Sequence, residues 1–384
     1  MPGGLLEHSS QPEALLVEAR RIVIKIGSAQ LIDKLTGHAN MGCFHALAAD
    51  IAGLRQRGVD VVLVSSGAVA LGRPRLNLPT TRKLRLDEKQ AAAAVGQTVL
   101  IQTWDQAFTP HGFHAAQALL SPSDTENRRR WLNSRTTLET LLQLGAVPVV
   151  NENDTVATEE LRYGDNDRLA ARVAQLVSAD LLVILSDVDG LYDADPATNP
   201  DAVHIPVVDA ITPDIAALAG PSRAGTAGTG GMATKIAAAE MAMAAGCSTV
   251  ITRGDSERPV SALLEGVRAT WFRASVSPES AKRVWIAGSL APSGRLHLDE
   301  GATRAVKSGR SLLAAGITQV EGQFDRGSAI RLVDHAGQAF ATALAGYDSH
   351  ECRQIAGKQS DEIEAALGYR RGAALVHATD LVLD

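Results

Sequence analysis

Short apolar runs that alternate with helix-length stretches rich in alanine and leucine constrain the fold of this chain more than any other feature. The runs cover residues 22–26, 59–64, 147–150, 181–185 and 249–252. The helical stretches cover residues 44–57, 91–108, 132–144, 167–177 and 235–245. Runs that are apolar throughout are typical of strands buried on both faces, and strands joined by helices form right-handed crossovers. We therefore predict an α/β fold with an open, mostly parallel sheet sandwiched by helices.

The pattern changes after about residue 272, and this change predicts a second domain in the chain of 384 residues. Residues 275–293 contain prolines and a glycine and are typical of a linker, with a strand-like piece over residues 284–287. Short, turn-bounded runs follow over residues 295–299, 330–334 and 339–344, with a helix expected near residues 303–308. They predict a small, mainly β barrel. The predicted boundaries are 20–272 for the first domain, 273–292 for the linker and 293–371 for the barrel.

Net charge, cysteine content and the absence of long apolar runs limit where this protein can act and what it can bind. The formal net charge is −6, which argues against a protein that mainly coats nucleic acid or an anionic membrane. The cysteines, Cys43, Cys247 and Cys352, lie far apart and are predicted to be reduced, partly buried thiols. The first twenty residues lack the apolar run of a signal peptide, and no run is long enough to span a membrane. We therefore expect a cytoplasmic protein.

Small, polar or charged residues follow four of the apolar runs, at the edge where the carboxyl ends of parallel strands meet and ligands bind. They are Gly27 and Ser28, then Ser65, Ser66, Gly67 and Ala68, then Asn151, Glu152, Asn153 and Asp154, and finally Ser186 and Asp187. Each group alone could be ordinary turn and helix-capping chemistry. Together they indicate a ligand site, and main-chain N–H groups at Gly27 and Gly67 could meet an anion there. No Gly-x-Gly-x-x-Gly motif follows the first run, which disfavours a dinucleotide-binding dehydrogenase.

Two lysines are placed to meet phosphate. Lys25 lies between isoleucines in a predicted central strand, where its ammonium is costly unless it has an anionic partner or reaches solvent from the strand end. Lys235 ends a glycine-rich segment, residues 228–235, that precedes a predicted helix. This segment could be a surface loop, but its main-chain donors, helix N-terminus and cation together favour a loop that binds nucleotide phosphates. It is not a P-loop, because Thr234 stands where that motif needs glycine.

A third polar group opens the helix predicted before the fourth run. Asp165, Asn166 and Asp167 are good capping residues, so a plain N-cap explains them. Alternatively, the two acids could hold an amino group or organise two lysines, and we favour this functional interpretation.

The order of these motifs resembles that of the glutamate 5-kinases, which belong to the amino-acid kinase superfamily. The resemblance rests on the motifs around Lys25, Ser66, Asn151, Asp167 and Lys235 and on the stretch from Asp187 through Gly190, Leu191 and Tyr192. The second region resembles a PUA domain that begins with Asp299, Glu300, Gly301 and Ala302. The resemblance thus extends over nearly the entire chain.

The resemblance implies ATP-dependent phosphorylation of the side-chain carboxylate of L-glutamate to glutamyl 5-phosphate, the first step of proline biosynthesis. It implies that glutamate is bound by Ser66, Gly67, Asp154 and Asn166. It implies that ATP is bound by Ser186, Asp187, Thr229, Gly230, Gly231, Met232, Ala233, Thr234 and Lys235. The expected catalytic residues are Lys25 and Lys235, which correspond to phosphate-contacting lysines, and Asp167, which corresponds to the acid that organises them.

Further expectations follow from the same resemblance. Mg²⁺ is expected to be bound mainly through the phosphates of ATP, with no metal ligands assigned in the protein. Proline is expected as a feedback inhibitor, and the chain is expected to form a homo-oligomer, a dimer or tetramer, through its kinase domains. A glutamyl phosphate reductase is a possible partner, whereas neither a membrane nor RNA is expected as one.

The acceptor itself limits the chemistry that is needed. A glutamate side chain has a pKa of about 4.3, so it is already an anion at neutral pH and needs no general base. Catalysis then consists of neutralising and aligning two anions. The alternatives are an acetylglutamate, aspartate, carbamate or uridylate kinase of the same superfamily, or an RNA-binding protein, because PUA domains often bind RNA. The basic residues of the second region are interspersed with acids, which favours a solvated mixed face instead.

Overall fold

The structure is a computed structural model that describes residues 11–33, 36–79, 81–156, 166–220, 231–288, 291–369 and 374–384. The chain divides into two compact units. The first comprises Met1–Glu126 and Ser134–Pro278, and the second comprises Asn127–Asn133 and Glu279–Asp384.

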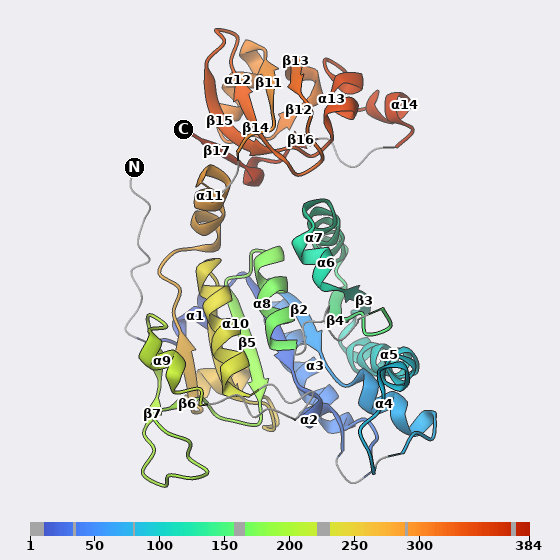
Figure 1. The fold of residues 1–384 in the computed structure, drawn as a ribbon, viewed down its shortest axis with the longest axis vertical. Coiled ribbons are helices and arrows are strands. Elements are labelled where there is room, and N and C mark those ends of the chain that lie inside the picture. Colours follow the sequence, from blue (N-terminus) through green and yellow to red (C-terminus); the bar gives the residue numbers. More distant parts are fainter. Residues whose placement is uncertain are drawn as a thin grey trace. The chain divides into compact units, whose positions relative to one another are not determined.

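An eight-stranded sheet with helices on both faces forms the first unit (Figure 1). The strand order is β3-β4-β2-β1-β5-β9-β10-β8, and among the pairings of the described residues in this sheet only β9–β10 is antiparallel. The strands are β1 (Arg21–Ile26), β2 (Asp60–Ser65), β3 (Ala115–Leu120), β4 (Val147–Glu152), β5 (Leu181–Ser186), β8 (Val207–Val208), β9 (Ser248–Arg253) and β10 (Ala269–Phe272). A short antiparallel pair, β6 (Leu191–Tyr192) and β7 (His204–Ile205), lies beside it. The predicted open, mostly parallel sheet is confirmed.

The helices of this unit follow the predicted alternation with the strands. They are α1 (Ala14–Glu18), α2 (Ser28–Leu31), α3 (Met41–Gln56), α4 (Ala68–Arg75), α5 (Leu86–Phe108), α6 (Pro122–Glu126), α7 (Arg128–Gln143), α8 (Asn166–Leu176), α9 (Pro213–Ala217) and α10 (Met232–Ala244). The first residues of α7 are assigned to the second unit. None of the helices in the described ranges combines the length and the apolar character that a bilayer crossing requires.

The alternation of side chains along β1 decides which residues enter the main core. Ile22, Ile24 and Ile26 are fully buried in one cluster with residues of α3 and α5, including Phe44 and Trp104. Because successive side chains of a strand point to opposite faces, Lys25 lies on the other face of the sheet. Helix α8 packs against that strand, and α10 packs against α8 and β9. Lys25 is thereby directed toward the start of α8 instead of the apolar core.

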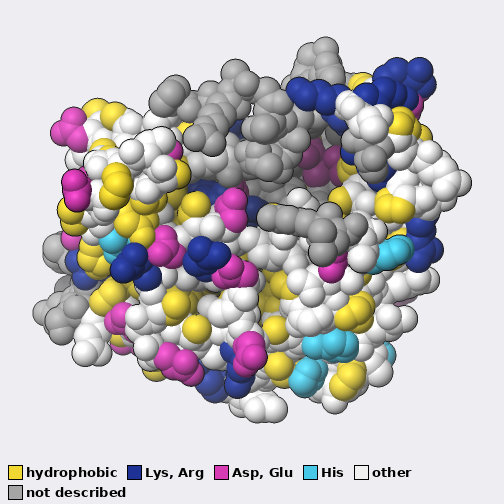
Figure 2. Space-filling model, turned by 90° about the horizontal axis from the view of Figure 1, so that it is seen from below, with side chains coloured by type: hydrophobic (Ala, Val, Ile, Leu, Met, Phe, Trp, Pro, Cys, Tyr) yellow, Lys and Arg dark blue, Asp and Glu magenta, His cyan; other side chains and the backbone are white. Residues whose placement is uncertain are grey.

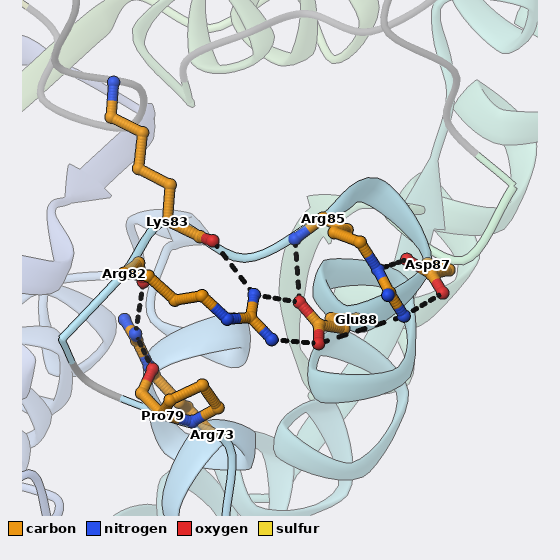
Figure 3. A network of polar contacts seen from close by, with 7 residues as sticks. All are labelled: Arg73, Pro79, Arg82, Lys83, Arg85, Asp87 and Glu88. Carbon is orange, nitrogen blue, oxygen red and sulfur yellow. Dashed lines mark hydrogen bonds and ion pairs between the residues drawn. The ribbon is translucent and has the colours of Figure 1, made fainter.

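Helix α5 begins at Leu86, five residues before the helical stretch predicted from residue 91. The Arg85 main-chain N–H donates to Glu88 Oε2 at 2.9 Å, and Arg82 donates to both oxygens of Glu88 at 2.7 and 2.6 Å (Figure 3). The hydrogen bonds from Arg82 lower the pKa of Glu88 to about 2. The first turn of α5 consists mainly of charged residues that cap the helix N-terminus. It therefore lacks the apolar periodicity from which the helix was predicted, and the predicted start is too late.

The second unit is mainly β, as predicted. Its five-stranded sheet has the order β13-β11-β14-β15-β17, and β12 pairs with β16. The strands are β11 (Gly294–Leu298), β12 (Leu312–Leu313), β13 (Ile317–Gly322), β14 (Ala329–Val333), β15 (Ala339–Leu344), β16 (Ala374–Val376) and β17 (Leu381–Leu383). The helices are α11 (Pro278–Gly288), α12 (Glu300–Lys307), α13 (Ser349–Ile355) and α14 (Ile363–Leu367). These elements enclose a separate core.

Two features of this unit differ from the sequence prediction. The strand-like piece over residues 284–287 is wrong, because α11 is helical through it. Ile286 is buried against one face of this helix, whereas Val284 is 73% exposed. The Trp285 ring lies 6.3 Å from that of Trp131, and the Arg128 guanidinium lies 4.5 Å from the Trp285 ring. The unit also continues beyond residue 371, because β17 pairs with β15.

The three cysteines are free thiols, as predicted. Cys43 is partly buried, and Cys247 and Cys352 are buried. Burial raises the pKa of Cys43 to about 11 and that of Cys352 to about 12. These thiols therefore carry little thiolate at neutral pH.

Candidate active site

Three charged side chains, predicted from segments far apart in the sequence, meet on the α8 side of the sheet. Lys25 comes from β1, Asp167 is the second residue of α8, and Lys235 lies in the first turn of α10. Lys25 Nζ is 2.6 Å from Asp167 Oδ1, and Lys235 Nζ is 3.1 Å from Asp167 Oδ2. The exposed fractions are 8% for Lys25, 3% for Lys235 and 0% for Asp167. We call these three residues the lysine–aspartate cluster.

The electrostatics of the lysine–aspartate cluster favour an anionic ligand. Burial by itself raises the pKa of Asp167, but the two ammonium groups outweigh burial and hold this pKa below its ordinary range. Asp167 is therefore a carboxylate, and the three side chains together carry one net positive charge. A buried positive charge is costly without a counter-charge. A phosphate group beside the two lysines would supply one.

The segment that leads into α10 is described only from Gly231 onward. Gly231 is the N-cap of α10, and Met232, Ala233, Thr234 and Lys235 form its first turn. Thr234 Oγ1 donates to Asp167 Oδ2 at 3.0 Å, which ties this turn to the lysine–aspartate cluster. The predicted ATP residues Thr229 and Gly230, and Asp165 before α8, lie outside the described residues.

Two of the predicted glutamate residues are also brought together. Asn166, the first residue of α8, donates from Nδ2 to Ser66 Oγ at 2.8 Å, although the two residues are 100 positions apart. Gly67 is the N-cap of α4 and has φ +110°, a conformation that suits glycine. Asp154 lies in the turn after β4 and is partly buried.

Two further residues join this group: Asn151, which belongs to a predicted strand-end motif but has no predicted substrate role, and Gln97 of α5, which no motif predicts. Asn166 Nδ2 also donates to Asn151 Oδ1 at 3.0 Å, and Asn151 Nδ2 donates to Gln97 Oε1 at 3.0 Å. Gln97 carries one usable signal in the sequence, since it is a polar residue inside an alanine-rich helix, but nothing there reveals its partner.

The remaining predicted ATP residues stand at the end of β5. Ser186 Oγ donates to Asp187 Oδ1 at 3.1 Å. Asp187 lines a cavity of about 500 Å³, together with Gln30 of α2 and Arg253 at the end of β9. In the described ranges, no three His, Cys, Asp or Glu side chains lie close enough together to hold a metal ion.

The surface charge is mixed in sign. Figure 2 shows one face of the molecule, on which Lys or Arg side chains lie beside Asp or Glu side chains. This arrangement agrees with the modest net charge of −6.

Comparisons with known proteins match both units. The model described as "Amino acid kinase family" matches residues 20–253, and the model described as "PUA domain" matches residues 294–367. The chain is 58% identical over 366 residues to a "Glutamate 5-kinase" of Caulobacter vibrioides (strain NA1000 / CB15N), covering 95% of this chain and 97% of that protein. It is 52% identical over 370 residues to a "Glutamate 5-kinase" of Paramagnetospirillum magneticum, covering 96% and 99%. It is 54% identical over 364 residues to "Glutamate 5-kinase 1" of Rhizobium meliloti, covering 95% and 92%.

Proposed function

The chain belongs to the amino acid kinase family, among the glutamate 5-kinases, and we propose that it transfers the γ-phosphoryl group of ATP to the side-chain carboxylate of L-glutamate. The product is glutamyl 5-phosphate, the first intermediate of proline biosynthesis. The observation that carries this proposal is the lysine–aspartate cluster, in which two buried ammonium groups share one carboxylate.

In the proposed reaction, a carboxylate oxygen of glutamate attacks the γ-phosphorus of ATP. The bond between that phosphorus and the bridging oxygen to the β-phosphate breaks, and ADP leaves with the bonding electron pair. Both reactants are anions, so the main barrier is their mutual repulsion. Lys25 and Lys235 place positive charge where the loose transition state spreads negative charge over the transferred group.

Asp167 has a different role in this proposal. It contacts both lysines and holds their ammonium groups a fixed distance apart, so that neither has to be organised when the substrates bind. Mg²⁺ would be held mainly through the phosphates of ATP, where it would supply further positive charge. No protein residue is assigned to the metal.

We propose that Ser66, Gly67, Asp154 and Asn166 bind glutamate, and that Ser186, Asp187 and residues 229–235 bind ATP. Proline as a feedback inhibitor, a homo-oligomer formed through the kinase units and a reductase as partner are proposed from the family resemblance. ATP is a cytoplasmic metabolite, so we propose the cytoplasm as the location.

A hydroxamate-trapping assay tests the reaction, because hydroxylamine captures an acyl phosphate directly. With MgATP and L-glutamate, we expect γ-glutamyl hydroxamate and an equal amount of ADP. Parallel reactions with acetylglutamate, aspartate, carbamate and UMP should release far less ADP. Robust ADP formation with one of those acceptors and none with glutamate would reject the proposal. Adding proline to the glutamate reaction tests feedback inhibition in the same assay.

A further inference from the structure

A chain of hydrogen bonds links helix α5 to the proposed glutamate site. It runs from Gln97 of α5 to Asn151 at the end of β4, then to Asn166 at the start of α8 and to Ser66 after β2. Building on the glutamate site proposed above, we propose that Gln97 is a positioning residue that holds Asn151, and through it Asn166 and Ser66, in the orientation that faces the substrate.

One main-chain group sets the orientation of every amide in this chain. The Glu152 N–H lies 2.9 Å from the Asn151 side chain, and a main-chain N–H can only donate, so the atom facing it is the oxygen Oδ1. The Asn151 amide nitrogen therefore faces Gln97. Because that nitrogen also only donates, Gln97 must present its oxygen Oε1, 3.0 Å away.

The same reasoning extends in the other direction. Asn151 Oδ1 accepts from Asn166, so Asn166 must present its nitrogen Nδ2, which also lies 2.8 Å from Ser66 Oγ. Both hydrogens of Asn166 Nδ2 are thus engaged, and its Oδ1 remains as an acceptor. Ser66 Oγ accepts from Asn166 and keeps its own hydrogen for donation.

This polarity suits a free amino acid. An acceptor at Asn166 Oδ1 matches an ammonium group, and a donor at Ser66 Oγ matches a carboxylate. If Asn166 turned its amide over, both groups would present the wrong polarity to such a substrate. The orientation of the Asn166 amide therefore affects glutamate affinity.

Gln97 is suited to hold this orientation from behind the site. Its side chain is only 7% exposed. Trp104, two helical turns further along α5, donates from Nε1 to Ser65 Oγ at 2.9 Å, so α5 supports the ends of both β2 and β4. Gln97 Nε2 is buried without a hydrogen-bond partner among the described residues, so its Oε1 is the atom the network uses. Without that acceptor, the buried Asn151 nitrogen loses its partner and only the Glu152 N–H still holds the Asn151 amide. The amide is then held at one end alone, so it positions Asn166 less firmly.

The test compares Gln97→Met, which removes the acceptor at similar volume, with Gln97→Glu, which keeps an oxygen facing Asn151. For Gln97→Met we expect the KM for glutamate to rise about tenfold, as for loss of a buried hydrogen-bond partner. The kcat and the KM for ATP should stay within about twofold. Gln97→Glu should bind glutamate at least about threefold more tightly than Gln97→Met, because it retains an acceptor for Asn151.

The matched control is Thr103→Val on the same helix. Thr103 is 6% exposed and donates to the Val99 carbonyl at 2.8 Å, but it takes no part in the chain to Asn166. The Thr103→Val substitution should leave the KM for glutamate unchanged. Calorimetric titration of glutamate into each variant measures affinity independently of turnover, and thermal unfolding establishes that each variant is folded.

The proposal is overturned if folded Gln97→Met binds glutamate like the wild type, or if Gln97→Glu is no better than Gln97→Met. A parallel loss of kcat, ATP affinity and thermal stability would show a merely structural role and would also overturn it. Should Gln97→Met not fold, Gln97→Asn takes its place, since its shorter amide leaves Asn151 without the acceptor. Failure of the proposed kinase activity is distinguished from failure of the Gln97 proposal, because in that case the wild type itself would form no hydroxamate.

Discussion

Asp167 shows at the scale of one residue how burial and charge are balanced in this protein. Its carboxylate is fully buried between two ammonium groups, and they keep it ionised despite the burial. Such a group stabilises the fold only while both partners are present, and removing one partner of a buried ion pair typically costs about 3–5 kcal/mol.

The pH dependence of stability follows from the lowered pKa of Asp167. Since the folded pKa lies below the unfolded one, the contribution of Asp167 is fully present above its ordinary pKa and is lost as the pH falls through the lowered value. Wild-type stability in urea should therefore drop more steeply than that of Asp167→Asn as the pH is lowered from about 5 to 3. Parallel curves for the two proteins would contradict this expectation.

Lys235 is expected to act on turnover. Lys235→Ala should lower kcat by about two to three powers of ten, the typical loss for a charged donor that acts on the transition state, while glutamate affinity changes little. The kcat from coupled ADP release and the affinity from calorimetry check this. Lys358→Ala in the second unit is the control, and near-wild-type turnover of Lys235→Ala would remove the proposed role.

Asp154 is expected to act on binding instead. Asp154→Ala should raise the KM for glutamate and change kcat less, because its carboxylate is proposed to meet the substrate ammonium. Steady-state kinetics at saturating ATP separate the two parameters. An unchanged KM for glutamate would withdraw Asp154 from the site.

At the scale of elements, α5 depends on a close approach to α4. A Cβ atom added at Gly72 or at Gly96 would stand 1.8 Å from a main-chain oxygen of the other helix. The two helices can therefore keep this spacing only with glycine at both positions. Gly96 directly precedes Gln97, so the spacing also sets where the Gln97 amide lies.

Gly96→Ala should destabilise the first unit by about 3 kcal/mol or more, since backbone cannot move aside as a flexible side chain can. It should also weaken glutamate binding through the displaced Gln97. Chemical denaturation and calorimetry measure the two effects. Gly288→Ala in α11 is the control, because a Cβ there meets nothing within 4 Å, and equal stability of both variants would contradict the argument.

At the scale of the whole molecule, the proposed chemistry belongs to one unit. The lysine–aspartate cluster and the chain from Gln97 to Ser66 all lie within Met1–Glu126 and Ser134–Pro278, and the second unit has its own sheet and core. Separate cores allow separate folding of the two units.

A chain truncated after Pro278 should therefore still form glutamyl hydroxamate, with a KM for glutamate within about threefold of the full chain. Its solubility should fall, because Trp131 loses Trp285 as a neighbour. The hydroxamate assay and thermal unfolding of the truncated chain check this, and a folded but inactive product would show that the second unit contributes to the site.

The sequence by itself determined the central strands, the order of the motifs and the residue types of the site. Continuous apolar runs indicate strands that are buried on both faces of the sheet, so β1, β2, β4, β5 and β9 were predictable. Strand β3 was missed because its alanine-rich segment has no such run. The strand-like apolar residues of α11 were misassigned because apolar side chains do not reveal which partner buries them.

Only the tertiary structure decided how the polar groups are paired and oriented. Asp167 could have been a helix cap, and its position between two lysines depends on β1 and α10 lying on either side of α8's start. Gln97 and Asn151 are 54 positions apart, and the direction of their hydrogen bond is set by one main-chain N–H. Hydrogen-bond polarity depends on contacts in three dimensions, which no local pattern of residues encodes.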